Sequence, residues 1–179
     1  MLALPGSAYL YQGEELGLPE HTALPDEVRQ DPQFHRSSGD EIGRDGCRIP
    51  MPWEGDAPAA GFNTTGELWL PQPDSYAALA VDRQEGVAGS TLELYRTLLR
   101  LRRDRGLGTG TLTPLTDLGP DVVAYRSTHT PTSGAGATLV VLNLGANPIT
   151  LPKGEILVTS TDLDGRALPQ DAAAWIAQA

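Results

Sequence analysis

The chain has 179 residues, of which 40% are hydrophobic and 20% are charged, values typical of a globular protein with a substantial core. Its net charge of −10 and its pI near 4.6 argue against nucleic acid and anionic membranes as partners, because no basic patch outweighs the acidic side chains. A single cysteine, Cys47, excludes an internal disulfide and predicts a reducing compartment. No run resembles a membrane span or a signal peptide, so we expect a cytoplasmic protein.

A short buried strand is predicted near the start of the chain. Residues 7–11 form an apolar run rich in aromatic side chains, and Gln12, Gly13, Glu14 and Glu15 follow directly. In parallel α/β barrels the active site lies at the carboxyl ends of the strands, so polar side chains at this point favour a functional edge. The alternative is that the two glutamates open a helical turn and contact only solvent.

The segment 18–89 is predicted to be a long excursion without regular periodicity. It is rich in proline and glycine, and a connection of this length inside a compact protein is usually functional or disordered. Phe34, Trp53, Phe62 and Trp69 are spread along it. These aromatic side chains favour a packed excursion over a mobile linker.

Residues 43–53, Gly-Arg-Asp-Gly-Cys-Arg-Ile-Pro-Met-Pro-Trp, are a candidate binding loop. Their glycines and prolines exclude a helix and a central strand, so the two arginines and Asp45 lie on irregular backbone. An arginine offers a rigid fork of donors and Trp53 offers a flat apolar face, which together suit a hydroxyl-rich ligand. The alternative is an Arg–Asp pair that staples the loop over a small core of Met51 and Trp53.

A helix is predicted at residues 90–105. Ser90 and Glu93 fit a Ser-x-x-Glu capping box, apolar side chains recur every three or four residues, and Gly106 ends the helix. Five arginines are predicted to cover its solvent face: Arg96, Arg100, Arg102, Arg103 and Arg105.

Short strands are predicted beyond residue 107. Runs rich in valine, leucine and threonine lie at 111–117, 122–127, 138–144 and 155–160, and 172–177 is assigned as a strand rather than a short helix. Strands at this spacing are typical of an antiparallel β-sandwich. We therefore predict two domains, residues 1–106 and residues 107–179.

The order of these features resembles the C-terminal part of the family 13 glycoside hydrolases, the α-amylase superfamily, especially its α-glucosidases and oligo-1,6-glucosidases. The resemblance is carried by Tyr-Leu-Tyr-Gln-Gly-Glu-Glu-Leu-Gly at 9–17, by the candidate loop, by Gly-Phe at 61–62, and by Leu-Tyr-Arg to Leu-Arg at 94–102. It implies an α/β plus all-β fold. In this fold the end of a (β/α)8 TIM barrel, with strand eight at 7–11 and helix eight at 90–105, precedes an antiparallel β-sandwich domain.

The resemblance also implies which residues meet a sugar. In the family, the arginine that matches Arg48 lies in the subsite of the non-reducing glucose, where it contacts a ring hydroxyl and an acidic residue from an early strand. A glutamate of the Gln-Gly-Glu-Glu turn lies near the neighbouring subsite, and Glu14 is the first candidate for it, with Glu15 the second. The implied substrate-binding residues are Arg48, Glu14, Glu15 and Gln12.

No catalytic residue is expected in this chain. The family works by retention, with one carboxylate as nucleophile and a second as acid, and both come from strands upstream of strand eight. Arg44 and Asp45 are expected to shape the loop. Met1 is then expected to be an internal methionine of a longer enzyme, and the chain alone is expected to be inactive. The implied partner is an oligosaccharide, no cofactor or metal is predicted, and the oligomeric state is left open.

Three functions therefore stay open. The first is the C-terminal portion of a retaining α-glucosidase that hydrolyses α-glucosidic bonds in oligosaccharides. The second is the same portion of a trehalose synthase or transglucosidase relative. The third is a non-catalytic sugar-binding or structural β-module that carries a vestigial barrel remnant.

Overall fold

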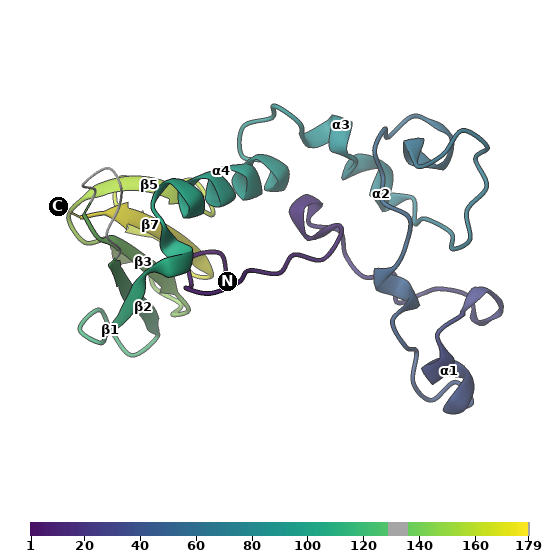
Figure 1. Ribbon diagram of the computed structural model, residues 1–179, viewed down its shortest axis with the longest axis horizontal. Helices are drawn as coiled ribbons and strands as arrows, with labels where there is room; N and C mark the ends of the chain where they lie inside the picture. The colour runs from purple at the N-terminus through teal and green to yellow at the C-terminus, as the bar shows by residue number, and fades with distance from the viewer. Residues whose placement is uncertain (129–135, 179) are drawn as a thin grey trace. The chain divides into compact units, whose positions relative to one another are not determined.

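The computed structural model describes residues 1–128 and 136–178 (Figure 1). The chain forms two compact units: unit 1 comprises Met1–Tyr9 and Leu94–Ala179, and unit 2 comprises Leu10–Glu93. Unit 1 is therefore built from both ends of the chain, with unit 2 inserted between them. The predicted domains, residues 1–106 and 107–179, stay a prediction. No helix in the described ranges is long and apolar enough to cross a membrane.

Unit 1 contains a five-stranded antiparallel sheet with the strand order β1-β2-β3-β7-β5 (Figure 1). All five strands were predicted to within two residues: β1 (Thr111–Leu115), β2 (Val122–Thr128), β3 (Thr138–Asn143), β5 (Glu155–Thr159) and β7 (Ala172–Ala177). Two short strands that were not predicted, β4 (Ile149–Thr150) and β6 (Ala167–Leu168), form a separate ribbon.

The five-stranded sheet buries side chains on both faces, because successive residues of a strand point to opposite sides. On one face, Val141 and Ile176 pack with Leu168 of the ribbon. On the other face, Val140 and Trp175 pack with apolar side chains of the N-terminal segment and of helix α4 (Thr91–Asp104). The second layer over the first face is thus a two-stranded ribbon, and the β-sandwich stays a prediction.

Helix α4 matches the predicted helix to within one residue at each end. The Ser90 hydroxyl accepts the N–H of Glu93 at 3.3 Å, and Gly106 ends the helix region in the left-handed conformation with φ 61°. The apolar face was predicted slightly too wide, because Leu99 is 41% exposed.

Two of the five arginines predicted to cover the solvent face of the helix, Arg102 of α4 and Arg105 directly after it, do not lie free in solvent. The guanidinium of Arg102 donates hydrogen bonds to the carbonyl oxygens of Leu2 at 2.7 Å, Leu4 at 2.6 Å and Gly6. The Arg105 side chain donates to Thr138 at 2.7 Å. Arginine has five donors in a fixed fork, so it satisfies backbone carbonyls that have no partner in a helix or sheet.

The strand predicted at residues 7–11 is wrong. This segment has no regular structure, and Tyr9 is 81% exposed. A β-strand requires a hydrogen-bonded neighbour, and no described strand pairs with these residues. Apolar composition alone cannot supply that neighbour.

Unit 2 is a packed excursion, as predicted. The aromatic side chains on which that prediction rested, however, are not in its buried core. Leu24, Ile49, Leu70 and Tyr76 are buried together. By contrast, the tryptophans of the excursion are about half exposed, with Trp53 at 47%. The unit is held by short helical turns: η1 (Glu14–Leu16), η2 (Asp26–Val28), α1 (Pro32–Arg36), η3 (Asp45–Cys47), η4 (Pro58–Gly61), α2 (Ser75–Ala78) and α3 (Val81–Gln84).

Candidate functional site

The acidic stretch after Tyr11 forms a single turn of 3₁₀ helix, η1. Gly13 precedes it with φ +89°, and an ideal Cβ at this position would lie 2.8 Å from the Leu18 side chain, so the turn requires glycine. The carboxylate of Glu15 accepts the N–H of Gly13 at 2.9 Å. Glu14 is exposed. The stretch therefore opens a helical turn, as the alternative stated, but Glu15 does not contact only solvent, because its carboxylate binds the N–H of Gly13.

A pocket of about 200 Å³ lies between this turn and the candidate loop, within unit 2. Gln12 and Glu14 line one side of it, and Ile49 and Met51 line another. The Gln12 side-chain amide donates to the carbonyl oxygen of Ile49 at 3.4 Å, which ties the turn to the loop. An amide and a carboxylate beside apolar side chains can together hold a small polyhydroxylated molecule.

Tyr76 closes part of the same pocket. Its hydroxyl donates to the carbonyl oxygen of Pro19 at 2.7 Å. Burial raises the pKa of the Tyr76 phenol, and the charges of Cys47 and Glu20 raise it further. The phenol therefore stays neutral and keeps its proton for this hydrogen bond.

Arg48 does not line this pocket. Its Nη1 donates to Oδ2 of Asp31 at 3.1 Å and lies 4.0 Å from Oδ1 of Asp45. The Arg48 side chain is 33% exposed, whereas those of Asp31 and Asp45 are 8% and 1% exposed. Of the four predicted site residues, the structure thus brings Gln12 and Glu14 together at the pocket, and leaves Arg48 and Glu15 outside its lining.

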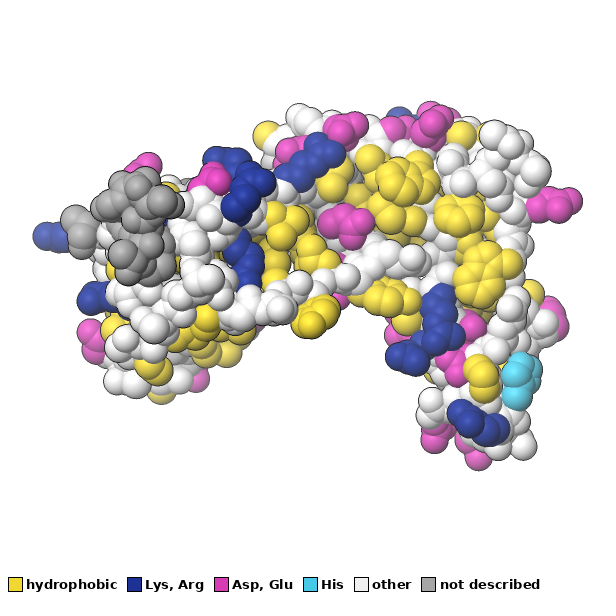
Figure 2. Space-filling view, viewed as in Figure 1, with side chains coloured by type: hydrophobic (Ala, Val, Ile, Leu, Met, Phe, Trp, Pro, Cys, Tyr) yellow, Lys and Arg dark blue, Asp and Glu magenta, His cyan; other side chains and the backbone are white. Residues whose placement is uncertain are grey.

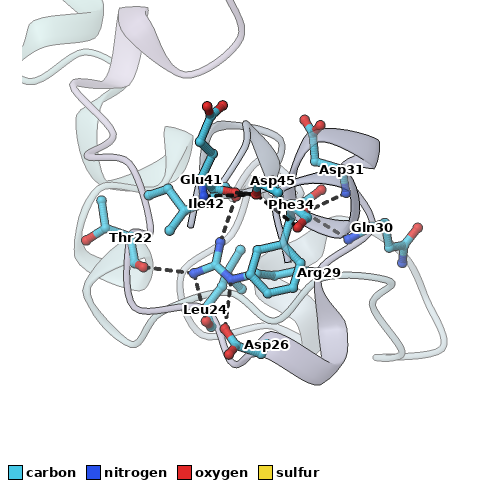
Figure 3. A network of polar contacts seen from close by, with 11 residues as sticks. Thr22, Leu24, Asp26, Arg29, Gln30, Asp31, Phe34, Glu41, Ile42 and Asp45 are labelled. Carbon is cyan, nitrogen blue, oxygen red and sulfur yellow. Dashed lines mark hydrogen bonds and ion pairs between the residues drawn. The ribbon is translucent and has the colours of Figure 1, made fainter. Parts of the chain in front are cut away.

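Two aspartates join the candidate loop to the chain around residue 31 (Figure 3). Oδ2 of Asp45 accepts the N–H groups of Gln30 and Asp31, both at 2.8 Å. In return, Oδ2 of Asp31 accepts the N–H of Arg44 at 3.0 Å, and its Oδ1 accepts the N–H of Gln33 at 2.9 Å. We call this arrangement the aspartate clasp. It confirms that Asp45 shapes the loop.

Asp31 was not identified from the sequence. It is the N-cap residue of α1, with Pro32 at the first helical position. An Asp-Pro pair is a recognisable signal for a helix start. That signal predicts the cap but not the contact with Arg48, which is 17 residues away.

The aspartate clasp should make unit 2 sensitive to acid. Hydrogen bonds from the N–H groups of Gln33 and Arg44, and then the charges of Arg48 and Arg44, hold the pKa of Asp31 below its ordinary value of 3.8. A carboxyl with a lowered folded-state pKa stabilises the fold above its unfolded pKa, and this stabilisation is lost as the pH falls through the folded value. We expect the stability difference between the wild type and Asp31→Asn to be constant above about pH 5 and to shrink below about pH 4.

Urea unfolding of both proteins across this pH range measures that difference. Asp26→Asn provides the control, because Asp26 is 81% exposed and pairs with Arg29 at 3.4 Å. Exposed ion pairs contribute little to stability. A difference for Asp31→Asn that does not change with pH would contradict the lowered pKa.

Arg29 is a buried residue that holds together the backbone next to the aspartate clasp (Figure 3). Its guanidinium donates to the carbonyl oxygens of Leu24 at 2.9 Å and of Thr22 and Ile42 at 3.1 Å. It also lies 5.3 Å from the centre of the Phe34 ring, a cation–π distance. This arginine is structural, since its Nη1 and Nη2 donate to backbone and its Nε lies 3.4 Å from the Asp26 carboxylate.

Gln84 fastens the acidic turn to the start of helix α4. Its side-chain amide donates to the carbonyl oxygens of Leu16 at 2.9 Å and Leu79 at 2.8 Å, and its Oε1 accepts the N–H of Leu92 at 3.2 Å. Gln84 was not identified from the sequence. Within residues 1–128 and 136–178, no three His, Cys, Asp or Glu side chains are grouped to hold a metal ion.

Comparison with known proteins identifies the class to which this fold and site belong. The family model "Alpha amylase, catalytic domain" matches residues 1–109, more than half of the chain. The chain therefore belongs to the α-amylase family, glycoside hydrolase family 13, which confirms the resemblance noted in its motifs.

The chain is similar to proteins with several different names. A probable alpha-glucosidase of Rhizobium meliloti is 43% identical over 103 residues, which are 58% of this chain and 18% of that protein. Trehalose synthase/amylase TreS of Mycobacterium tuberculosis is 35% identical over 132 residues, 70% of this chain and 19% of that protein. The crystal structure of the alpha-glucosyl transfer enzyme XgtA superimposes with a TM-score of 0.73 and 36% identity, over 98% of this chain and 34% of that one. The chain thus spans about a fifth to a third of these proteins.

Proposed function

We propose that the chain is the C-terminal portion of a cytoplasmic, retaining α-glucosidase that hydrolyses α-glucosidic bonds in oligosaccharides. The observation that carries the proposal is the pocket between the Gln12–Glu15 turn and the candidate loop. This pocket lies inside residues 1–109, which the α-amylase family model matches. In this proposal, residues 1–106 end a (β/α)8 barrel and residues 107–179 form the C-terminal β-sandwich domain.

Three of the four polar side chains then have a role in holding sugar. Glu14 and Gln12 face the pocket and are suited to accept and donate hydrogen bonds with ring hydroxyls, and Met51 supplies an apolar wall. Arg48, which does not line the pocket, offers the guanidinium donors that Asp31 does not use. Glu15 is already engaged by Gly13, so it supports the turn rather than the sugar.

Neither glutamate is assigned to bond cleavage. Retention requires a pair of carboxylates about 5–5.5 Å apart across the scissile bond. Glu15 is used as a cap, and the buried aspartates Asp31 and Asp45 accept backbone N–H groups. The nucleophile and the acid are therefore assigned to the part of the family domain outside this chain, and the chain alone is expected to hydrolyse nothing.

A chimera tests the proposal. This chain replaces the matching third of XgtA, and the purified chimera is incubated with nitrophenyl α-glucoside. We expect sustained hydrolysis, and we expect Arg48→Met to lower kcat/KM by about a hundredfold, as for loss of a charged contact to the transition state. Arg100→Met, which removes an exposed arginine of α4, is the matched control and should change kcat/KM less than about twofold.

Two outcomes contradict the proposal. The first is a chimera that matches XgtA in circular dichroism and in thermal transition but does not cleave the glucoside. The second is sustained turnover by the 179-residue chain alone, which would place catalytic groups inside it.

A glucosyl-transfer or isomerising enzyme is the second candidate. The similarity to XgtA and TreS favours it, since one is named an alpha-glucosyl transfer enzyme and the other a trehalose synthase/amylase. Product analysis of the chimera with maltose separates the two. Glucose alone supports the hydrolase, whereas trehalose or longer saccharides support the alternative.

A further inference from the structure

The aspartate clasp leaves Arg48 held at one edge only. Its Nη1 is bound to Asp31 at 3.1 Å. Among the described residues, no hydrogen bond or ion pair involves its Nη2 or Nε, and the side chain is 33% exposed. One edge of the guanidinium is therefore anchored within this chain, and the other has no partner among the described residues.

Asp31, which anchors Arg48, is itself held in one position. Gly43 has φ +67°, and an ideal Cβ on it would lie 2.6 Å from Cβ of Asp31, so the loop can pass Asp31 only at a glycine. Asp31 divides its oxygens, with Oδ1 on the Gln33 N–H and Oδ2 shared by the Arg44 N–H and Arg48. Its carboxylate cannot turn without losing a backbone hydrogen bond.

Asp45 adds a second, oriented charge. Its Oδ2 is occupied by two N–H groups, and its Oδ1 is buried without a hydrogen bond and lies 4.0 Å from Nη1 of Arg48. A buried oxygen of this kind is costly unless a positive charge lies close by. Both aspartates therefore favour the same position of the guanidinium.

We propose that Asp31 is a positioning residue, which orients Arg48 so that the free edge of its guanidinium donates to a sugar hydroxyl. The inference rests on the proposed function, because it assigns Arg48 to the sugar. A long side chain that is fixed before binding loses less conformational entropy when the ligand arrives. Asp31 thus acts through Arg48 and does not touch the substrate.

The first test uses the 179-residue chain itself. ¹⁵N relaxation measures the order parameter of the Arg48 Nε–H in the wild type and in Asp31→Asn. We expect Arg48 to be more ordered than exposed Arg100 in the wild type, and to fall to the value of Arg100 in Asp31→Asn. Asp26→Asn, the same change at an aspartate that pairs with Arg29, should leave Arg48 unchanged.

The second test is a double-mutant cycle in the active chimera. Asp31→Asn should lower kcat/KM about tenfold when Arg48 is present and less than about twofold in the Arg48→Met background. A purely structural role for Asp31, as the cap of α1, predicts the same loss in both backgrounds. Asp31→Glu, which keeps the charge, should recover part of the activity.

The outcomes separate the two proposals. An inactive wild-type chimera counts against the proposed function, and the order of Arg48 then still decides whether Asp31 fixes it. An active chimera in which Asp31→Asn costs the same with and without Arg48 overturns the positioning role alone. Unchanged order of the Arg48 Nε–H in Asp31→Asn also overturns it.

Discussion

Replacing Gln84 by leucine should lower the free energy of unfolding of unit 2 by about 2 to 4 kcal/mol. Gln84 is 7% exposed, and its amide serves the carbonyl oxygens of Leu16 and Leu79 and the N–H of Leu92. Leucine fills a similar volume but leaves these three backbone groups without their partner. A buried backbone group that loses its hydrogen bond costs about 1 to 3 kcal/mol.

Hydrogen exchange detected by mass spectrometry would locate this effect. We expect faster exchange in peptides that contain the Gln12–Glu15 turn and the start of α4, in addition to a lower urea midpoint. Gln30→Leu is the matched control, because the Gln30 residue is exposed and only its backbone N–H is used by Asp45. If Gln84→Leu and Gln30→Leu unfold at the same urea concentration, Gln84 does not hold the turn.

Replacing Gly154 by alanine should cost unit 1 about 3 to 5 kcal/mol, a large part of the stability of a domain. Gly154 has φ +135°, a conformation that essentially only glycine adopts. An ideal Cβ there would lie 2.7 Å from Cγ2 of Ile176 and closer still to the carbonyl oxygen of Ala177. The next residue, Glu155, pairs with Ala177, so the clash falls on the pairing of β5 with β7.

Gly165→Ala is the control for this change. Gly165 also has a positive φ, +60°, but an ideal Cβ there would meet nothing within 4 Å. It should therefore cost only about 1 to 2 kcal/mol, the conformational penalty alone. Thermal unfolding followed by the fluorescence of Trp175, which is 5% exposed on β7, compares the two variants. Equal transition temperatures would show that the clash at Gly154 is relieved.

Elements whose signal is local were predicted well from the sequence. Helix α4 was identified from a capping serine and a 3.6-residue apolar repeat, both of which lie within 16 residues. The strands of the five-stranded sheet were identified from β-branched runs between turns. The segment 7–11 failed because its composition is that of a strand but its partners are not among the described residues.

Contacts between distant residues were not predictable in the same way. Asp31 and Arg48, or Gln84 and Leu16, meet only after the excursion has folded, and no spacing rule links them. The arginines of α4 show the same limit. The repeat indicated which residues avoid the apolar face, but it could not indicate that Arg102 would reach the carbonyl oxygens of the N-terminal segment.

Unit 2 is a nested segment, and this organisation affects how the protein can evolve. Residues 10–93 carry the turn, the candidate loop and the clasp, while every strand of the sheet comes from later in the chain. Recombination near residues 9 and 94 would exchange the whole segment as one cassette and keep the order of the strands intact. Under the proposed function, such an exchange would replace the sugar-binding residues and leave the pairing of the strands unchanged.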